Sequence, residues 1–290
     1  MLLNGKKRND SPVIVIDCHA VGWAMKHVHG VLSYDDRPTG VVYGFLNQIL
    51  TLFKRFDSNK FVFAWDSGRS LRKDIYLYYK NRAEERTEEE IEEYKIAKKQ
   101  FVLLRQKILP TMGFKNVFIQ TGYEADDIMA SVVMRNSHYF IIGSDDKDLY
   151  QLLGHCDMWK LRKKSIYTDQ DLMNEWDATP ETWAKQKQYS GCKGDNAPNI
   201  PGVRDKTAIK YVRGCLKGKK LQDILSTPKE FILRNKKLTT LPLEGTKTFN
   251  IDLNENFQIT DFIRLFEHYG FYSFMKKKKL QGWKEFCRAY

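Results

Sequence analysis

The stretch Val13-Ile-Val-Ile-Asp17 is a short, unbroken run of β-branched residues that ends in a carboxylate. Because it is apolar at every position before the last, it predicts a strand buried on both faces, as in a parallel sheet. Three further runs share this form, the last of them more weakly: Phe61-Val-Phe-Ala-Trp65, Tyr139-Phe-Ile-Ile142 and Asn116–Ile119.

Helical patterns separate these strands. Residues 40–56, 87–108 and 125–134 carry apolar side chains at helical spacing. The second pattern begins at Thr87, and Glu90 stands three residues later, which is the sequence of a capping box. Strands that alternate with helices predict an α/β fold with a central, mostly parallel sheet flanked by helices.

Basic residues are concentrated in the last third of the chain. Its 290 residues have a formal net charge of +12, and residues 201–290 hold 19 Lys and Arg against 9 Asp and Glu. This asymmetry favours a polyanionic partner, with nucleic acid the first candidate. A solvated basic surface with no specific partner is the alternative on charge alone.

The cysteines and the hydropathy indicate a cellular setting. Five cysteines are scattered without a Cys-x-x-Cys pair, which argues against a disulfide framework or a zinc site and for a reducing compartment. The N-terminus lacks the apolar core of a signal peptide, and no run reaches the roughly 20 apolar residues of a membrane span. We therefore expect a soluble, cytoplasmic protein without a membrane partner.

Carboxylates stand where the predicted strands end and where the third helix begins. Seven of them occupy these points: Asp17, Asp66, Glu124, Asp126, Asp127, Asp146 and Asp148. Because the carboxyl ends of parallel strands meet at one edge of a sheet, we expect these side chains to converge there. They would repel one another unless cations neutralised them, and oxygen ligands select hard ions such as Mg²⁺ or Mn²⁺.

Two such ions roughly 4 Å apart would stabilise the attacking and leaving oxygens of phosphodiester hydrolysis. An acidic crevice of another use, such as a phosphatase or a regulatory Ca²⁺ site, is the alternative on spacing alone.

Several motifs resemble the 5′→3′ exonucleases and flap endonucleases, which include phage-encoded 5′-nucleases and the N-terminal nuclease domain of bacterial DNA polymerase I. The resemblance covers roughly residues 13–213, and its blocks occur in family order: Val15-Ile-Asp17, Tyr43-Gly-Phe-Leu-Asn47, Ala64-Trp-Asp66, Tyr79-Lys-Asn-Arg82, Gly122-Tyr-Glu-Ala-Asp-Asp127, Asp146-Lys-Asp-Leu-Tyr-Gln-Leu-Leu153, Gly194-Asp-Asn196 and Gly202-Val-Arg-Asp-Lys-Thr-Ala208. The order and spacing of the blocks, more than any single one, carry the resemblance. It implies a PIN/5′-nuclease-like fold with a helical, helix–hairpin–helix-type DNA clamp.

The resemblance also implies roles for individual residues. It implies divalent-metal ligands at Asp17, Asp66, Glu124, Asp126, Asp127, Asp146, Asp148 and Asp195. It implies catalytic roles for Arg72, Lys80 and Arg82, and DNA contacts for Tyr79, Gly202, Arg204, Lys206, Thr207 and Lys210. Two Mg²⁺ ions are the implied cofactor, with Mn²⁺ as a substitute. Asp145 is an extra acid beside the pattern and stays outside the ligand set.

The sequence departs from the family pattern at a few positions. Cys192 stands where many members have an Asp, three residues before Asp195, and Cys18 replaces a small residue after the first Asp. Asn199 and Arg204 replace two glycines of the clamp hairpin. Glycines there would let backbone amides approach a DNA phosphate, so Arg204 would have to reach it through its side chain instead.

Together these features predict a Mg²⁺-dependent 5′→3′ exonuclease or flap endonuclease. We expect an α/β nuclease core at residues 1–167, with a basic arch segment at 67–110, and a helical, basic DNA-binding subdomain at 168–290. The expected partner is DNA with a 5′ flap, nick or RNA primer, in replication or repair, with replication proteins as further partners.

Two alternatives remain open on the sequence. One is a PIN-like ribonuclease, against which the clamp and the basic arch segment argue. The other is a non-catalytic, structure-specific DNA-binding protein with a degraded second metal site. Cys192 favours that second alternative, and the eight retained carboxylates disfavour it.

Overall fold

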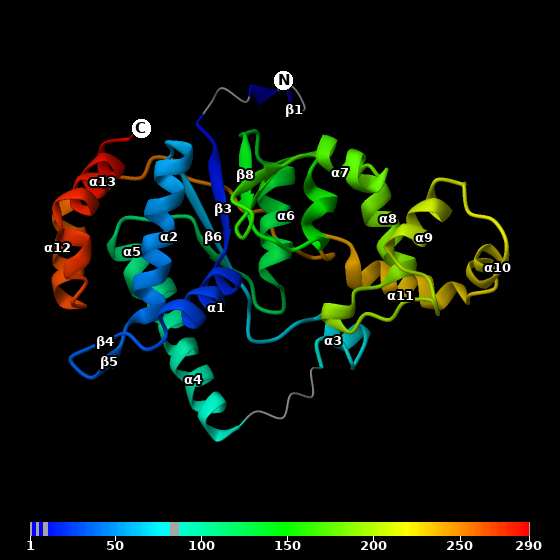
Figure 1. Ribbon diagram of the computed structural model, residues 1–290, viewed down its shortest axis with the longest axis horizontal. Helices are drawn as coiled ribbons and strands as arrows, with labels where there is room; N and C mark the ends of the chain where they lie inside the picture. The colour runs from blue at the N-terminus through cyan, green and yellow to red at the C-terminus, as the bar shows by residue number, and fades with distance from the viewer. Residues whose placement is uncertain (1, 4–5, 8–10, 82–86, 290) are drawn as a thin grey trace.

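A six-stranded sheet forms the centre of the computed structural model, which describes residues 2–3, 6–7, 11–81 and 87–289 (Figure 1). In chain order its strands are β3 (Val13–Asp17), β6 (Phe61–Trp65), β7 (Val117–Ile119), β8 (Phe140–Gly143), β9 (Asp157–Lys160) and β10 (Ser165–Tyr167). In the sheet they lie in the order β10-β9-β8-β3-β6-β7, and all neighbours are parallel except the antiparallel pair β9 and β10. The predicted central, mostly parallel sheet is confirmed, whereas β9 and β10 were not predicted.

Both faces of the sheet are covered, which explains why β3 is apolar at every position before Asp17. Ile14 and Ile16 pack into the hydrophobic cluster that contains α2 (Gly40–Phe56). Val13 and Val15 point the other way, into the cluster that contains α6 (Ala125–Arg135).

Further elements on the α2 side extend the first cluster. They are α1 (Cys18–His29), α4 (Glu88–Leu103), the π-helical turn η1 (Leu104–Ile108) and α5 (Leu109–Thr111). The predicted capping box is present, since Thr87 and Glu90 exchange hydrogen bonds at the start of α4. Short hairpins pair β1 (Leu2–Leu3) with β2 (Lys6–Lys7) and β4 (Ser33–Tyr34) with β5 (Arg37–Pro38).

A helical region follows the sheet and lies at the right of Figure 1. It comprises α7 (Asp169–Trp176), α8 (Pro180–Ser190), the 3-10 turn η3 (Lys193–Asp195), α9 (Asp205–Val212), α10 (Lys219–Leu225) and α11 (Lys229–Thr239). Ile200, Val203, Ala208 and Ile224 form a small core of its own. Two short elements join this region to the sheet: α3 (Arg72–Ile75) contacts α11, and the 3-10 turn η2 (Asp148–Leu152) contacts α8.

The last part of the chain returns to the sheet domain. The helices α12 (Ile259–His268) and α13 (Lys277–Arg288), with the 3-10 turn η4 (Tyr272–Met275) between them, lie beside α2, far from α9 (Figure 1). Their aromatic side chains join the core of the sheet, and the rings of Phe286 and Phe53 are 5.2 Å apart. The helical subdomain that we expected at 168–290 is therefore better bounded at about residue 240.

None of the helices in the described part of the chain is both long and apolar enough to cross a membrane.

Candidate active site

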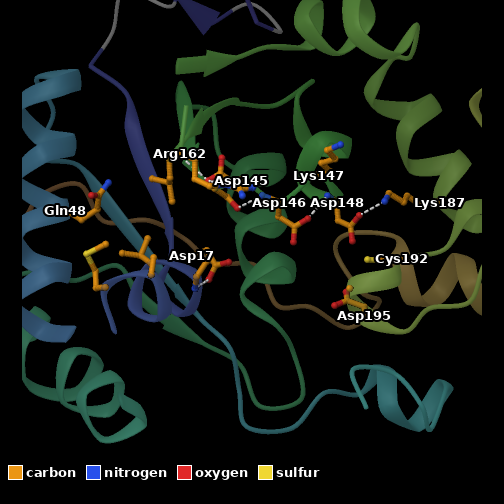
Figure 2. A pocket seen from close by; sticks show the side chains of 17 residues that line it. Asp17, Gln48, Asp145, Asp146, Lys147, Asp148, Arg162, Lys187, Cys192 and Asp195 are labelled. Atoms are coloured by element: carbon orange, nitrogen blue, oxygen red, sulfur yellow. Dashed lines mark hydrogen bonds and ion pairs between the residues drawn. The ribbon is translucent and has the colours of Figure 1, made fainter. Parts of the chain in front are cut away.

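Carboxylates from several elements line one open cleft at the carboxyl edge of the sheet. The cleft has a volume of about 770 Å³, and Asp17, Asp146, Asp148 and Asp195 are among its lining residues (Figure 2). Asp17 ends β3 and caps α1 by accepting a hydrogen bond from the backbone N–H of Ala20 at 2.9 Å.

The tip of β6 is tied to the start of α6. One oxygen of Asp66 accepts a hydrogen bond of 2.7 Å from the backbone N–H of Ala125. This contact places Asp66 next to Asp126, which stands in the first turn of α6. The parallel sheet and the helix start thus gather acids that are far apart in the sequence.

These acids raise one another's pKa values. Desolvation, and then the charge of Asp66, raise the pKa of Asp17 to about 7. Desolvation raises the pKa of Asp126 well above its usual range, and the charges of Asp146 and Asp17 add to the effect. The pKa of Asp146 is raised by desolvation and by Asp148. A cluster in which like charges suppress ionisation is one that a bound cation would stabilise.

Lys80 follows α3 in the chain, and its side chain faces the acidic cluster. Lys80 has a positive φ of 50°, which is uncommon for a residue other than glycine. Its backbone N–H donates to the carbonyl of Asp195 at 2.8 Å, and its ammonium donates to Glu124 at 2.8 Å. Burial lowers the pKa of Lys80, but the charges of Asp195 and Glu124 outweigh that effect, so it stays a cation.

Tyr79 connects the same two acids. Its hydroxyl lies 3.1 Å from an oxygen of Glu124 and 3.0 Å from an oxygen of Asp195, and its ring is buried. Burial raises the pKa of the Glu124 carboxyl, yet Lys80 and Arg72 overcome it and hold that pKa below its usual range. We expected Tyr79 to contact DNA. The structure instead buries its ring and makes its hydroxyl a hydrogen-bond donor to these acids.

Arg72 and Asp127 have a setting that differs from the one expected. The Arg72 guanidinium, which is 1% exposed, binds both Asp127 oxygens at 2.7 and 2.8 Å, and its Nε donates to the carbonyl of Leu238. Asp127 is fully buried and also accepts hydrogen bonds from the backbone N–H groups of Glu124 and Leu243. With both oxygens engaged, Asp127 has no lone pair directed at a metal, and Arg72 has no face directed at a substrate.

Asp145 and Arg82 are the two remaining residues near the predicted site. Asp145, which we left outside the predicted ligand set, accepts hydrogen bonds from the backbone N–H and the Nε of Arg162. Arg82, expected to be catalytic, lies outside the described residues.

A second group sits at the other end of the cleft. Asp148 accepts a hydrogen bond of 2.8 Å from the ammonium of Lys187, a buried residue of α8. The thiol of Cys192 and one oxygen of Asp195 lie close to Asp148 (Figure 2). No motif marks Lys187 as a member of this site, because only the fold places its helix α8 opposite η2.

The predicted clamp consists of α8 and α9, which contact each other, and the segment 191–204 that joins them, with a turn at Pro201 and Gly202. Asn199, one of the residues that replaces glycine, donates its side-chain N–H to the carbonyls of Ile200 and Val203 and so closes the turn. Gly202 adopts a positive φ of 72°. Lys220 reaches over this turn to bind the carbonyl of Pro201, a cation that sequence reasoning missed.

The candidate DNA-contacting side chains of the clamp are open to solvent. Arg204, Lys206 and Lys210 are exposed, and Thr207 is half-buried between them. Arg204 precedes α9 and makes no capping hydrogen bond with its side chain. Its guanidinium is thus free of the helix end, as its expected role in phosphate contact requires.

Residues 12–177 match the family model described as "5'-3' exonuclease, N-terminal resolvase-like domain". The chain belongs to this 5′-3′ exonuclease family. The matched segment holds β3, β6 and β8 and the acids that stand at their ends.

Curated members of the 5′-3′ exonuclease family extend the match along the chain. The DNA polymerase I of Bacillus caldotenax is 27% identical in an alignment 263 residues long that covers 82% of this chain and 29% of the polymerase. The 5′-3′ exonuclease of Halalkalibacterium halodurans is 30% identical over 58% of this chain, which spans 56% of that protein. The 5′-3′ exonuclease of Buchnera aphidicola subsp. Schizaphis graminum is 27% identical, over 80% of this chain and 76% of its own length.

Solved structures share the fold. The bacteriophage T5 5′-exonuclease, described with bound divalent metal ions (zinc), superposes with a TM-score of 0.67 at 23% identity, over 80% of this chain and 90% of its own. The catalytic core of Rad2, solved with a DNA substrate, has a TM-score of 0.54 at 14% identity over 98% of this chain and 92% of its own.

Proposed function

We propose that this protein is a divalent-metal-dependent 5′-nuclease that hydrolyses phosphodiester bonds of DNA at 5′ ends, flaps, nicks or RNA primers. The observation that carries the proposal is the convergence of acids at the carboxyl edge of a parallel sheet. Asp17 and Asp146 line the open cleft, and their charges act on Asp126, which lines an adjoining pocket with Asp148 and Asp195. Membership of the 5′-3′ exonuclease family supports it. So does the solved complex of a T5 flap endonuclease with DNA and metal ions, a protein with a similar fold at 22% identity.

The chemistry of the acids fits divalent cations. Asp17, Asp66, Asp126 and Asp146 offer only hard oxygen donors, the set that Mg²⁺ and Mn²⁺ prefer. The pKa values of Asp17, Asp126 and Asp146 are raised by burial and by neighbouring carboxylates, and a cation would relieve that repulsion. Bound there, such an ion would supply Lewis-acid stabilisation of charge on a phosphodiester. Asp148 and Asp195 are the candidate ligands for a second ion, whereas we assign Asp127 a structural role.

The residues around the acids position positive charge for a phosphate. Lys80 is fixed by its backbone bond to Asp195, and its ammonium, about one-third exposed, borders the acidic cluster. A cation held there would stabilise negative charge that develops on the scissile phosphate. Glu124 and Tyr79 hold the ammonium in place, so we infer that they act through Lys80.

The clamp provides the binding surface for the rest of the DNA. Arg204, Lys206 and Lys210 lie on the exposed face of α9 and its N-terminal turn, where duplex phosphates would be neutralised. The clamp is connected to the cleft through α8, whose Lys187 binds Asp148. The clamp and the cleft would then form one rigid unit. That unit would set the distance between the duplex contacts and the phosphodiester bond that is cut.

The test is a panel of 5′-labelled substrates: a flapped duplex, a nicked duplex, a blunt duplex and a single-stranded RNA, each with Mg²⁺ and with excess chelator. We expect Mg²⁺-dependent cutting of the flapped and nicked DNA, with 5′-phosphates on the products. Faster cutting of the RNA would favour a PIN-like ribonuclease. Tight flap binding without cutting in any divalent metal would favour a binding protein.

A further inference from the structure

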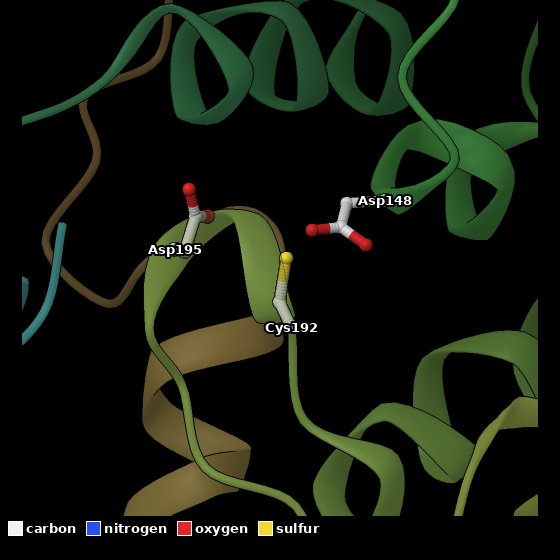
Figure 3. Close-up of side chains that lie close together, drawn as sticks. All are labelled: Asp148, Cys192 and Asp195. Atoms are coloured by element: carbon white, nitrogen blue, oxygen red, sulfur yellow. The ribbon is translucent and has the colours of Figure 1, made fainter. Parts of the chain in front are cut away.

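A thiol stands beside two carboxylates at one end of the acidic cleft. One ligand atom each of Asp148, Cys192 and Asp195 lies within 4.8 Å of the other two, and the sulfur points toward the Asp148 carboxylate (Figure 3). Asp148 comes from η2, whereas Cys192 directly precedes η3 and Asp195 ends it. In the described part of the chain, no other group of three or more His, Cys, Asp or Glu residues meets this spacing.

The loop that carries the thiol is closed at its base. The backbone of Cys192 exchanges two hydrogen bonds of 3.0 Å with Ala197, and the N–H of Asp195 donates to the carbonyl of Cys192. Gly191 has a positive φ of 60°, and a Cβ there would lie 2.3 Å from the Ala197 carbonyl, so the turn requires glycine. The sulfur is therefore held in position before any ligand arrives, which reduces the entropy lost on binding.

Cations already balance the two carboxylates of this group. Lys187 donates to Asp148 at 2.8 Å, and the Lys80 ammonium lies 3.6 Å from Asp195. Mg²⁺ is strongly hydrated and gains most from uncompensated oxygen charge, which this group lacks. A sulfur donor, by contrast, selects softer ions.

The donor set also matches the layout of a catalytic rather than a structural zinc site. Structural zinc sites are closed by four protein ligands, whereas catalytic sites use three and leave one position open. Here two oxygens and one sulfur line a cleft that is open to solvent.

We propose that Asp148, Cys192 and Asp195 bind a thiophilic divalent ion of the zinc class in preference to Mg²⁺. On binding, the S–H bond breaks, the proton passes to solvent and a sulfur–metal bond forms, without any change of oxidation state. The sequence argues against a zinc site because it has no Cys-x-x-Cys pair. The fold nevertheless brings Asp148 from a distant segment to Cys192 and Asp195. This inference rests on the proposed function, because the same cleft would hold the scissile phosphate.

Cadmium is the direct probe, since a cadmium–thiolate bond gives an ultraviolet charge-transfer band. Metal-free full-length protein is titrated with Cd²⁺, and Zn²⁺ and Mg²⁺ are then added as competitors. We expect a charge-transfer band with the intensity of one cadmium–thiolate bond. Zn²⁺ at a concentration comparable to that of Cd²⁺ should abolish this band, and Mg²⁺ should leave it in place. Cys192→Ser should lose the band and bind Zn²⁺ at least about tenfold more weakly.

Two variants complete the design. Cys215→Ser removes the exposed thiol and should leave the band unchanged, which assigns the signal to the cleft. Cys192→Asp restores an all-oxygen group, so it should lose the band and reach half-saturation at a lower Mg²⁺ concentration. A melting curve of each variant confirms that the protein is folded.

The outcomes separate this inference from the proposed function. A Cys192-dependent band in a protein that cuts no DNA would support the metal preference and overturn the nuclease assignment. A protein that cuts DNA with Mg²⁺ but gives no band, or a band that survives in Cys192→Ser, would overturn the metal preference alone. Displacement of Cd²⁺ by equimolar Mg²⁺ would overturn it as well.

Discussion

Arg72 and Asp127 form a buried ion pair with two direct hydrogen bonds, and each is also bonded to the backbone of the segment near residue 240. The pair joins the segment after β6 to α6 and to the end of α11. It supports the site from below by fixing the elements that carry Lys80 and Asp126.

We predict that Arg72→Met lowers the free energy of unfolding by about 3–5 kcal/mol, because it leaves the Asp127 carboxylate buried without its partner. Asp127→Asn should be destabilising for the same reason, and the double variant should lose less than the sum of the two. Urea unfolding of the four proteins measures this coupling. A catalytic role for Arg72 would instead give a normal unfolding curve with slow DNA cutting.

At the scale of elements, the segment with Lys80 and the clamp with Lys206 and Lys210 serve different steps. Lys80 is held against Glu124 beside the acids, whereas the clamp lysines are exposed on α9. The first should act on the reaction and the second on binding.

We predict that Lys80→Ala lowers the single-turnover rate of flap cutting more than it weakens flap binding, because its charge acts on the scissile phosphate. Rate and affinity are measured separately, at saturating protein and in the absence of divalent metal. A change in affinity alone would assign Lys80 to positioning of the DNA.

The clamp lysines make the converse prediction. Lys206→Ala and Lys210→Ala should each flatten the dependence of log K on log salt by about 0.9, the value for one duplex phosphate contact. Lys277→Ala on α13 is the matched control, since that exposed lysine belongs to the helices beside α2 and should not change the slope. An equal effect of Lys277→Ala would show that binding follows net charge and not the clamp.

For the whole molecule, the acidic cluster makes stability depend on pH and on metal. Asp17 has a pKa of about 7 in the folded state, and the pKa values of Asp126, Asp146 and Asp195 are also raised, so the metal-free folded protein holds more protons than the unfolded chain. Their contribution is complete at acid pH and is lost as the pH rises through about 7. Glu124 and His19, whose pKa values are lowered, act in the opposite direction but are two groups against four.

We therefore predict that the melting temperature in excess chelator falls between about pH 5.5 and pH 8, and that Mg²⁺ raises it more at the higher pH. Asp17→Asn should flatten the pH slope in chelator, because it removes one of the raised groups. Calorimetry at the two pH values checks both statements. A melting temperature that rises with pH in chelator would contradict the account.

The sequence predicted the parts of the fold that local patterns encode. The strands at residues 13–17 and 61–65, and the helices at 40–56 and 125–135, stand within a residue or so of their predicted bounds, because burial on two faces or one face leaves a clear apolar period. The antiparallel edge strands β9 and β10 were missed, since Asp157–Lys160 and Ser165–Tyr167 lack that period.

The sequence did not predict contacts between residues that lie far apart in the chain. Arg72 and Asp127 are 55 residues apart, and nothing local to either shows that they bind each other and not a substrate or a metal. The same holds for Lys187 and Asp148, and for the return of the last helices to α2. In each case the partner is fixed by the topology of the sheet and its connections, which no short motif contains.

The central claim is that the acids at the sheet edge cut DNA with divalent metal, and Asp126→Asn tests it most directly. The measurement is the single-turnover cutting rate of a 5′-labelled flap by the wild type, Asp126→Asn and the control Asp145→Asn, whose carboxylate binds Arg162 instead. We predict a rate at least about a hundredfold lower for Asp126→Asn alone, with flap affinity nearly unchanged and no cutting by any of the three in excess chelator. A near wild-type rate for Asp126→Asn, or cutting in chelator, would contradict the account.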